Sequence, residues 1–149
     1  MLNALTHTFI HVLDQDEALD FYVGKLGLEV HADADLGFMR WLTVIVPGRP
    51  ECELVLAAPE MGNDEATAAE IRALLAKGGS AGVIFSVEDC RRAYEELVEK
   101  GVEFTQEPTE HFYGIDCGLR DPFGNPLRLT QPAPGPIEVP PPGELANAD

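Results

Sequence analysis

The residues of this chain that could carry chemistry are histidines, acids and aromatic residues in segments of alternating polarity. Residues 6–13 alternate in this way, and successive side chains of a strand point to opposite faces. His7, Phe9 and His11 therefore share one face of a predicted strand. His7 and His11 lie about 13 Å apart on an extended strand, which is too far for both to hold one metal ion. Their side chains suit hydrogen bonding to a ligand or proton transfer.

Aromatic side chains occur beside polar ones at two further places. Trp41 follows Arg40 in an apolar segment, and only one of the two can face a ligand. The pattern leaves open whether Trp41 stacks on a ligand or packs in a core or an interface. Phe112 and Tyr113 follow His111 directly. These three residues suit a small molecule that is mainly apolar, although they could equally pack in a core.

The elements that must position these residues follow from an internal repeat. Residues 7–30 and 82–104 share the order of a strand, an acidic turn, an amphipathic helix and a glycine. Asp14 and Asp89 occupy matching places as helix caps, and glycine ends each predicted helix. A repeat at this scale predicts two similar halves in one domain.

The repeat gives the predicted boundaries. We expect one domain over residues 1–131, made of module one (4–58), a connector with a helix (59–80) and module two (81–131), followed by a proline-rich tail (132–149). The predicted strands span 6–13, 29–34, 38–46, 51–57, 83–87, 102–107, 112–120 and 127–131. Residues 121–125 are interpreted as a turn, because they lack the alternating oxygen ligands of a calcium loop.

Composition excludes several classes of partner. The chain has 149 residues and a net charge of −16, which disfavours nucleic acids and anionic membranes. No apolar run is long enough to span a membrane, and the first residues do not resemble a signal peptide, so a cytoplasmic location is expected. The three cysteines, Cys52, Cys90 and Cys117, form no metal-binding motif. They are expected to be small core residues.

The tail has its own composition. Six of the residues from 132 to 149 are prolines, and proline fits neither a helix interior nor a central strand. We expect an extended, mostly disordered segment. An alternative is that the tail wraps around a partner subunit.

Three motifs resemble those of one family. The runs D-x-D-E-A-L-D-F-Y-x-x-x-L-G-L-E-V, G-V-E-F and D-P-F-G-N-P-L-R-L are similar to the vicinal oxygen chelate superfamily. That family includes glyoxalase I, extradiol dioxygenases and the bleomycin- and fosfomycin-resistance proteins. The resemblance covers about residues 4–131. It implies an α+β fold of two tandem β-α-β-β-β modules, whose curled mixed sheet surrounds a cleft, and a homodimer.

The resemblance also implies four metal-ligand positions, one on each of four strands. They fall on His7, Glu53, Gly82 and Arg128. Glycine has no side chain and arginine is a cation, so two of the four positions cannot bind a metal. We therefore expect a pocket that works without a metal, with an Arg128–Glu53 pair at its base.

These expectations lead to two functional hypotheses. The favoured one is a small-molecule-binding protein of the glyoxalase/bleomycin-resistance type, with no cofactor. Its ligand would be held by aromatic residues and a Glu/Arg/His cluster: His7, Phe9, His11, Trp41, Glu53, Phe112, Tyr113 and Arg128. The alternative is a glyoxalase-like lyase or isomerase, or an enzyme resembling an extradiol dioxygenase, with Ni, Zn, Mn or Fe at His7 and Glu53. In an enzyme, His7 or Glu53 would act as general base and Arg128 would stabilise an enolate or carboxylate. Whether the cleft lies within one chain or across two stays open.

Overall fold

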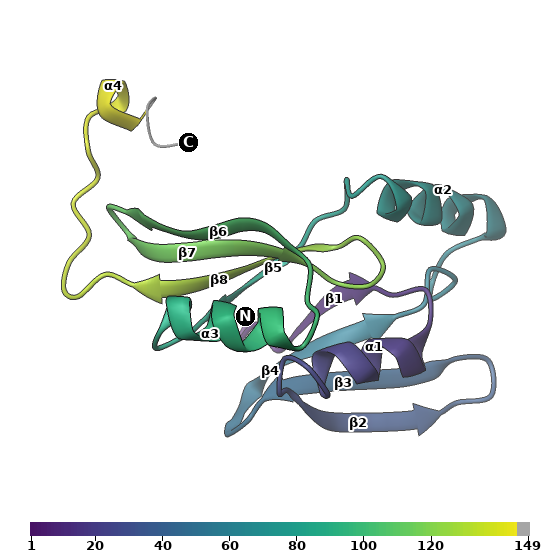
Figure 1. Ribbon diagram of the computed structural model, residues 1–149. Coiled ribbons are helices and arrows are strands. Elements are labelled where there is room, and N and C mark those ends of the chain that lie inside the picture. The colour runs from purple at the N-terminus through teal and green to yellow at the C-terminus, as the bar shows by residue number, and fades with distance from the viewer. Residues whose placement is uncertain (146–149) are drawn as a thin grey trace. The chain divides into compact units, whose positions relative to one another are not determined.

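The computed structural model describes residues 1–145 as two four-stranded sheets with flanking helices (Figure 1). The elements in chain order are β1 (His7–His11), α1 (Gln15–Tyr22), β2 (Glu29–Asp35), β3 (Arg40–Val46), β4 (Arg49–Ala57), α2 (Glu65–Ala76), β5 (Val83–Ser86), α3 (Cys90–Glu99), β6 (Phe104–His111), β7 (Gly114–Arg120), β8 (Pro126–Pro132) and α4 (Pro142–Leu145). The expected module order is thus present twice, and the α+β fold class is confirmed.

Both sheets have the same topology. Their strand orders are β1-β4-β3-β2 and β5-β8-β7-β6. In each sheet the first and last strands of the module pair in parallel, and the other neighbours are antiparallel. The connection from β1 to β4, like that from β5 to β8, includes one helix and two strands. The strand orders place β1 and β5 at one edge of their sheets. The sequence repeat is therefore a repeat of whole β-α-β-β-β units.

The three longer helices begin where the sequence predicts. Asp14, Asp64 and Asp89 are the N-cap residues of α1, α2 and α3, and each side chain accepts a hydrogen bond from a backbone N–H three residues later. These bonds satisfy N–H groups that have no partner within the helix. Gly27 and Gly101 both have a φ of +80°, a conformation that glycine adopts without strain.

Three residues of α1 are buried: Ala18, Phe21 and Tyr22. The helix ends at Tyr22, and the backbone bonds that follow it include a wider one, from Leu26 N to Phe21 O at 2.9 Å, which spans five residues.

Contacts between residues divide the chain into two compact units. Unit 1 comprises residues 1–81 and 121–125, and unit 2 comprises residues 82–120 and 126–149. In unit 1, Asp121 accepts a hydrogen bond from the Tyr22 hydroxyl at 2.7 Å and from the backbone N–H groups of Phe123 and Asn125. Asn125 in turn donates to the His11 carbonyl at 2.7 Å. The segment 121–125 is a turn, as predicted.

Three local expectations were wrong. Cys52 is exposed, unlike the buried Cys90 and Cys117, because β4 begins at Arg49 and its first four residues are all exposed. Strand β6 continues to His111, so Phe112 and Tyr113 form the turn before β7 and do not begin that strand. The tail contains the short helix α4; Pro142 can stand at its start because a first-turn N–H needs no helical partner. The last part of the predicted tail, 146–149, lies outside the described residues.

No helix within residues 1–145 has the length and apolar character needed to cross a membrane.

Candidate functional site

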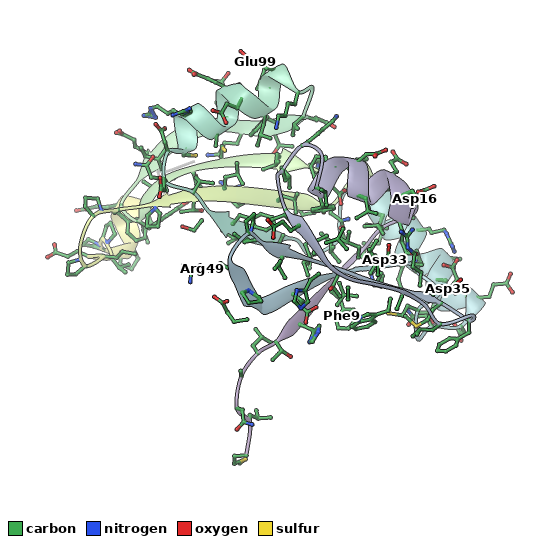
Figure 2. The ribbon with its side chains drawn as sticks, turned by 90° about the horizontal axis from the view of Figure 1, so that it is seen from below. Phe9, Asp16, Asp33, Asp35, Arg49 and Glu99 are labelled. Carbon is green, nitrogen blue, oxygen red and sulfur yellow. The ribbon has the colours of Figure 1, made fainter. Side chains whose placement is uncertain are left out.

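One face of the sheet in unit 1 carries the polar and aromatic side chains that the alternation predicts. Ile10 and Val12 are 3% and 0% exposed, whereas Phe9 is 54% exposed. His7 and Glu53 lie directly opposite each other in the parallel pairing of β1 with β4. Figure 2 shows Phe9 on the side of the strands away from α1. The predicted face is therefore real for these residues.

His7 and Glu53 form the polar centre of this face. His7 Nε2 lies 2.8 Å from Glu53 Oε2, and the Thr43 hydroxyl donates to Glu53 Oε1 at 2.7 Å. His31 Nε2 on β2 lies 3.9 Å from Glu53 Oε1, and Thr6 Oγ1 lies 2.9 Å from His7 Nδ1. Both Glu53 oxygens thus have a partner. We call this group of residues the His7–Glu53 cluster.

Trp41 extends the His7–Glu53 cluster with an aromatic surface. Its ring centroid is 5.8 Å from that of His7 and 6.3 Å from that of Phe9, the latter in an edge-to-face arrangement. Its neighbour Arg40 points the other way and donates to Asp33 on β2 and Asp16 on α1. Figure 2 shows these two aspartates near each other. The structure thereby decides that Trp41, and not Arg40, shares the face of the cluster.

His11 lies apart from the His7–Glu53 cluster on the same strand. It pairs with Ala57 at the far end of β4, four residues beyond the His7–Glu53 pair. Burial lowers the pKa of the His11 imidazole below its ordinary value, because it disfavours the charged form. Burial therefore favours the neutral form of His11, which lies at the other end of β1 from the His7–Glu53 cluster.

Two of the predicted ligand residues of unit 2, Tyr113 and Arg128, contact one buried acid. Asp116 on β7 is 2% exposed and accepts bonds from Arg128 Nε at 2.9 Å and from the Tyr113 hydroxyl at 2.9 Å. Arg128 Nη2 also donates to Asp116 and, at 2.7 Å, to Gln106. His111 Nε2 lies 2.9 Å from Asp116 Oδ1. We call these residues the Asp116 cluster.

The charge of Asp116 depends on these partners. Burial by itself would raise the pKa of Asp116, but the hydrogen bonds from Arg128 and Tyr113 and the positive charge of Arg128 outweigh it, and the pKa lies below its ordinary value. Burial and the bond to Asp116 raise the pKa of the Tyr113 hydroxyl. Tyr113 is consequently a hydrogen-bond donor at neutral pH.

The lowered pKa of Asp116 predicts an acid-dependent loss of stability. The stabilisation is complete above the unfolded-state pKa of about 4 and is lost as the pH falls through the lower folded-state pKa. The Asp116→Asn variant should therefore be less stable than the unmodified protein above about pH 4, with the gap narrowing below it. Urea unfolding at a series of pH values measures this gap. Asp20→Asn, at an exposed position of α1, is the control for the loss of one negative charge. A gap of constant size for Asp116→Asn would contradict the prediction.

Two of the four positions that the family resemblance assigned to metal ligands lack a ligating side chain. A Cβ atom at Gly82 would lie 1.6 Å from the Pro126 carbonyl oxygen, so no ligating side chain fits there without movement of the backbone. Arg128 is a cation paired with Asp116. Within residues 1–145, no three histidine, cysteine or acidic side chains are placed so as to hold a metal ion. Neither Gly82 nor Arg128 can therefore supply a ligand to a divalent metal.

Several partners in these clusters were not identified from the sequence. Thr43, His31, Gln106 and Asp116 were all missed. Asp116 had a usable signal, since an acid between apolar residues of a central strand must find a buried partner. The predicted Arg128–Glu53 pair stays a prediction, because the two residues belong to different units. Within unit 2, Arg128 forms its ion pair with Asp116.

The chain matches the family model described as the Glyoxalase/Bleomycin resistance protein/Dioxygenase superfamily over residues 4–129. It is also similar to the uncharacterized protein YurT of Bacillus subtilis (strain 168), with 35% identity over 124 residues, which is 83% of this chain and 95% of YurT.

The chain is also similar to solved structures. UcmS2 is 43% identical, with a TM-score of 0.82 over 87% of this chain and 98% of that one. TnmS3, an antibiotic binding protein from Streptomyces sp. CB03234, is 26% identical, with a TM-score of 0.72 over 89% of this chain and 98% of that one.

Proposed function

Since the chain belongs to the Glyoxalase/Bleomycin resistance protein/Dioxygenase superfamily, we propose that it binds a small organic molecule and needs no metal ion. The proposed site is centred on four residues of the set predicted from the sequence, His7, Phe9, Trp41 and Glu53, which all lie in unit 1. Function cannot be taken from the fold alone, because one scaffold can support many chemistries. The proposal therefore depends on the residues of the site.

One observation carries the metal-independent part of the proposal. At the position of Gly82 a Cβ atom would overlap the backbone of β8, and at the position of Arg128 a guanidinium already pairs with Asp116. Only His7 and Glu53 of the four family positions remain, and these two contact each other at 2.8 Å. A chelating metal needs several donors together with open positions for the substrate.

The sheet face that carries the His7–Glu53 cluster has the features of an aromatic binding surface. Phe9 is 54% exposed, and its contact with Trp41 leaves two rings beside the His7–Glu53 pair. Rings of this kind stack on flat apolar molecules, while the imidazole and carboxylate can orient a polar group on the ligand. The similarity to TnmS3, named as an antibiotic binding protein, supports an antibiotic as the class of ligand to test first.

Trp41 is the only tryptophan of the chain, so its fluorescence should report ligand binding directly. An aromatic antibiotic that binds should quench or shift this emission in a saturable way. Phe9→Ala should weaken binding about five- to tenfold, since one aromatic contact contributes about 1 kcal/mol. The control is Phe38→Ala, which removes an exposed ring elsewhere in unit 1 and should leave the affinity unchanged. Equal effects of the two changes, or no response to any aromatic compound, would contradict the proposal.

Metal analysis of the purified protein tests the metal-independent part. We expect no stoichiometric nickel, zinc, manganese or iron, and a melting temperature that rises with the ligand but not with these metals. Arg128→Glu restores a carboxylate at one family position and should still recruit no metal, because Gly82 leaves another position empty. Tight metal binding that is lost in both His7→Ala and Glu53→Gln would instead favour the glyoxalase- or dioxygenase-like enzyme.

We also propose that the protein is a homodimer located in the cytoplasm. The dimer is supported by the family, and the location by the absence of an apolar helix that could span a membrane within the described residues. Sedimentation at several protein concentrations measures the first, and fractionation of the native host measures the second.

A further inference from the structure

A pocket lies in unit 2 between the β6–β7 turn and the C-terminal tail. It has a volume of about 480 Å³ and is formed by residues 110–113 of the turn together with Pro140, Glu144 and Leu145 of the tail. In Figure 1 the tail leaves β8 and passes the end of the β6–β7 hairpin before reaching α4. We call this the hairpin–tail pocket. Its volume is in the range of small-molecule sites.

The start of the tail is held against the β6–β7 turn. The backbone N–H of Ala133 donates to the Tyr113 carbonyl at 2.9 Å, so the residue after β8 continues the pairing with the hairpin. The prolines that follow have a restricted φ and stiffen the segment.

Apolar surface in the hairpin–tail pocket is left uncovered. Phe112 is 39% exposed and Leu145 is 36% exposed. The ring of Phe112 meets that of Tyr113 edge to face, with centroids 5.2 Å apart and planes at 89°. Covering this surface with an apolar group would remove it from water, which is favourable.

The negative charge of the pocket favours a ligand with a positive charge. Glu110 and Glu144 both line it, and no lysine or arginine does. Glu110 has an ion pair with Arg91 at 3.4 Å, but both side chains are mostly exposed, so this pair competes only weakly. The net charge of −16 further raises the local concentration of cations around the protein.

We propose that the hairpin–tail pocket binds a small apolar amine in its protonated form. The ammonium group contacts the carboxylates of Glu110 and Glu144, and the apolar part lies against Phe112 and Leu145. This site does not use the His7–Glu53 cluster, although it shares Phe112 and Tyr113 with the ligand set predicted from the sequence.

The test uses three probes of similar shape on the full chain: benzylamine, benzyl alcohol and benzoate. Two-dimensional amide NMR at neutral pH follows the signals of residues 110–113, 144 and 145 during titration. We expect saturable shifts with benzylamine at millimolar concentration, binding at least fivefold weaker with benzyl alcohol, and no binding of benzoate. Benzyl alcohol binding as tightly as benzylamine, or the absence of saturable shifts, overturns the proposal.

Matched variants separate a specific contact from general attraction by the charged surface. Glu110→Gln and Glu144→Gln should each weaken benzylamine binding two- to fivefold, and Arg91→Gln should strengthen it by removing the competing ion pair. Glu138→Gln removes the same charge from an exposed tail position outside the pocket and should have no effect. Equal weakening by Glu138→Gln and Glu144→Gln overturns the proposal.

The readouts also keep this inference distinct from the proposed function. Benzylamine should leave the fluorescence of Trp41 in unit 1 unchanged while it shifts the amides of the hairpin–tail pocket. Failure of aromatic antibiotics to affect Trp41 would contradict the proposed function and leave the amine site standing.

Discussion

Replacing Asp121 by alanine is expected to lower the free energy of unfolding by about 3–5 kcal/mol. Asp121 is 4% exposed and accepts hydrogen bonds from the Tyr22 hydroxyl and from Asn125 Nδ2, both at 2.7 Å, as well as from two backbone N–H groups. Without the carboxylate, these buried donors would have no acceptor, because they would remain buried and could not form hydrogen bonds with water. Leaving such groups unpaired costs more than the bonds themselves contribute. Urea unfolding of the purified variant measures the loss.

Two further variants show whether the loss comes from this network. Tyr22→Phe removes one donor and leaves the rest of the network intact, so it should cost about 1–2 kcal/mol. Asp14→Ala removes only the N-cap of α1, whose side chain is exposed, and should cost about 1 kcal/mol. An Asp121→Ala variant no less stable than Asp14→Ala would show that the turn 121–125 does not hold unit 1 together.

The second large effect is expected at Gly82, where alanine should destabilise the protein by about 2–4 kcal/mol. The added Cβ atom would lie 1.6 Å from the Pro126 carbonyl oxygen and 2.7 Å from the carbonyl carbon. Both atoms belong to the backbone of β8, so the contact cannot be relieved by rotating a side chain. The parallel pairing of β5 with β8, which begins at Val83 and Leu127, would have to shift.

Gly118→Ala is the matched control for Gly82→Ala. It lies in β7 of the second sheet, and the closest atom to its added Cβ is the Thr105 hydroxyl oxygen at 2.8 Å. A threonine side chain can turn away from such a contact. The cost should therefore be about 1 kcal/mol or less. If Gly82→Ala were as stable as the unmodified protein, the backbone near residue 82 would have to move enough to accommodate a Cβ atom. A side chain could then occupy this metal-ligand position of the family.

Prediction from the sequence succeeded at the helix starts and along β1, where a local rule decides the outcome. Asp14, Asp64 and Asp89 cap the three helices because a short acidic side chain meets unpaired N–H groups at a helix start. Phe9 and His7 share a face because side chains alternate along a strand. The predicted strand 102–107 was too short, since β6 extends to His111. The added stretch contains Pro108 and has no alternation of apolar residues, so the sequence pattern gave no sign of it.

Prediction was incomplete wherever the partner is distant in the chain. The sequence placed Arg128 and Tyr113 among the ligand-binding candidates, yet the structure shows that both contact Asp116. It could not tell which of Arg40 and Trp41 faces the cluster, since alternation assigns opposite faces but does not say which face holds the ligand. The bonds of Arg40 to Asp16 and Asp33 settle the question for this strand.

The sequence by itself determined the repeated β-α-β-β-β fold, the start of each longer helix and the face on which His7, Phe9 and Glu53 lie. These features depend on periodicity and capping, which act over a few residues. Only the tertiary structure decided the pairs: Glu53 with Thr43, Asp116 with Arg128, and Tyr22 with Asp121, which are 99 residues apart. Such pairs follow from strand register and from turns packed against distant elements, and no local pattern encodes those.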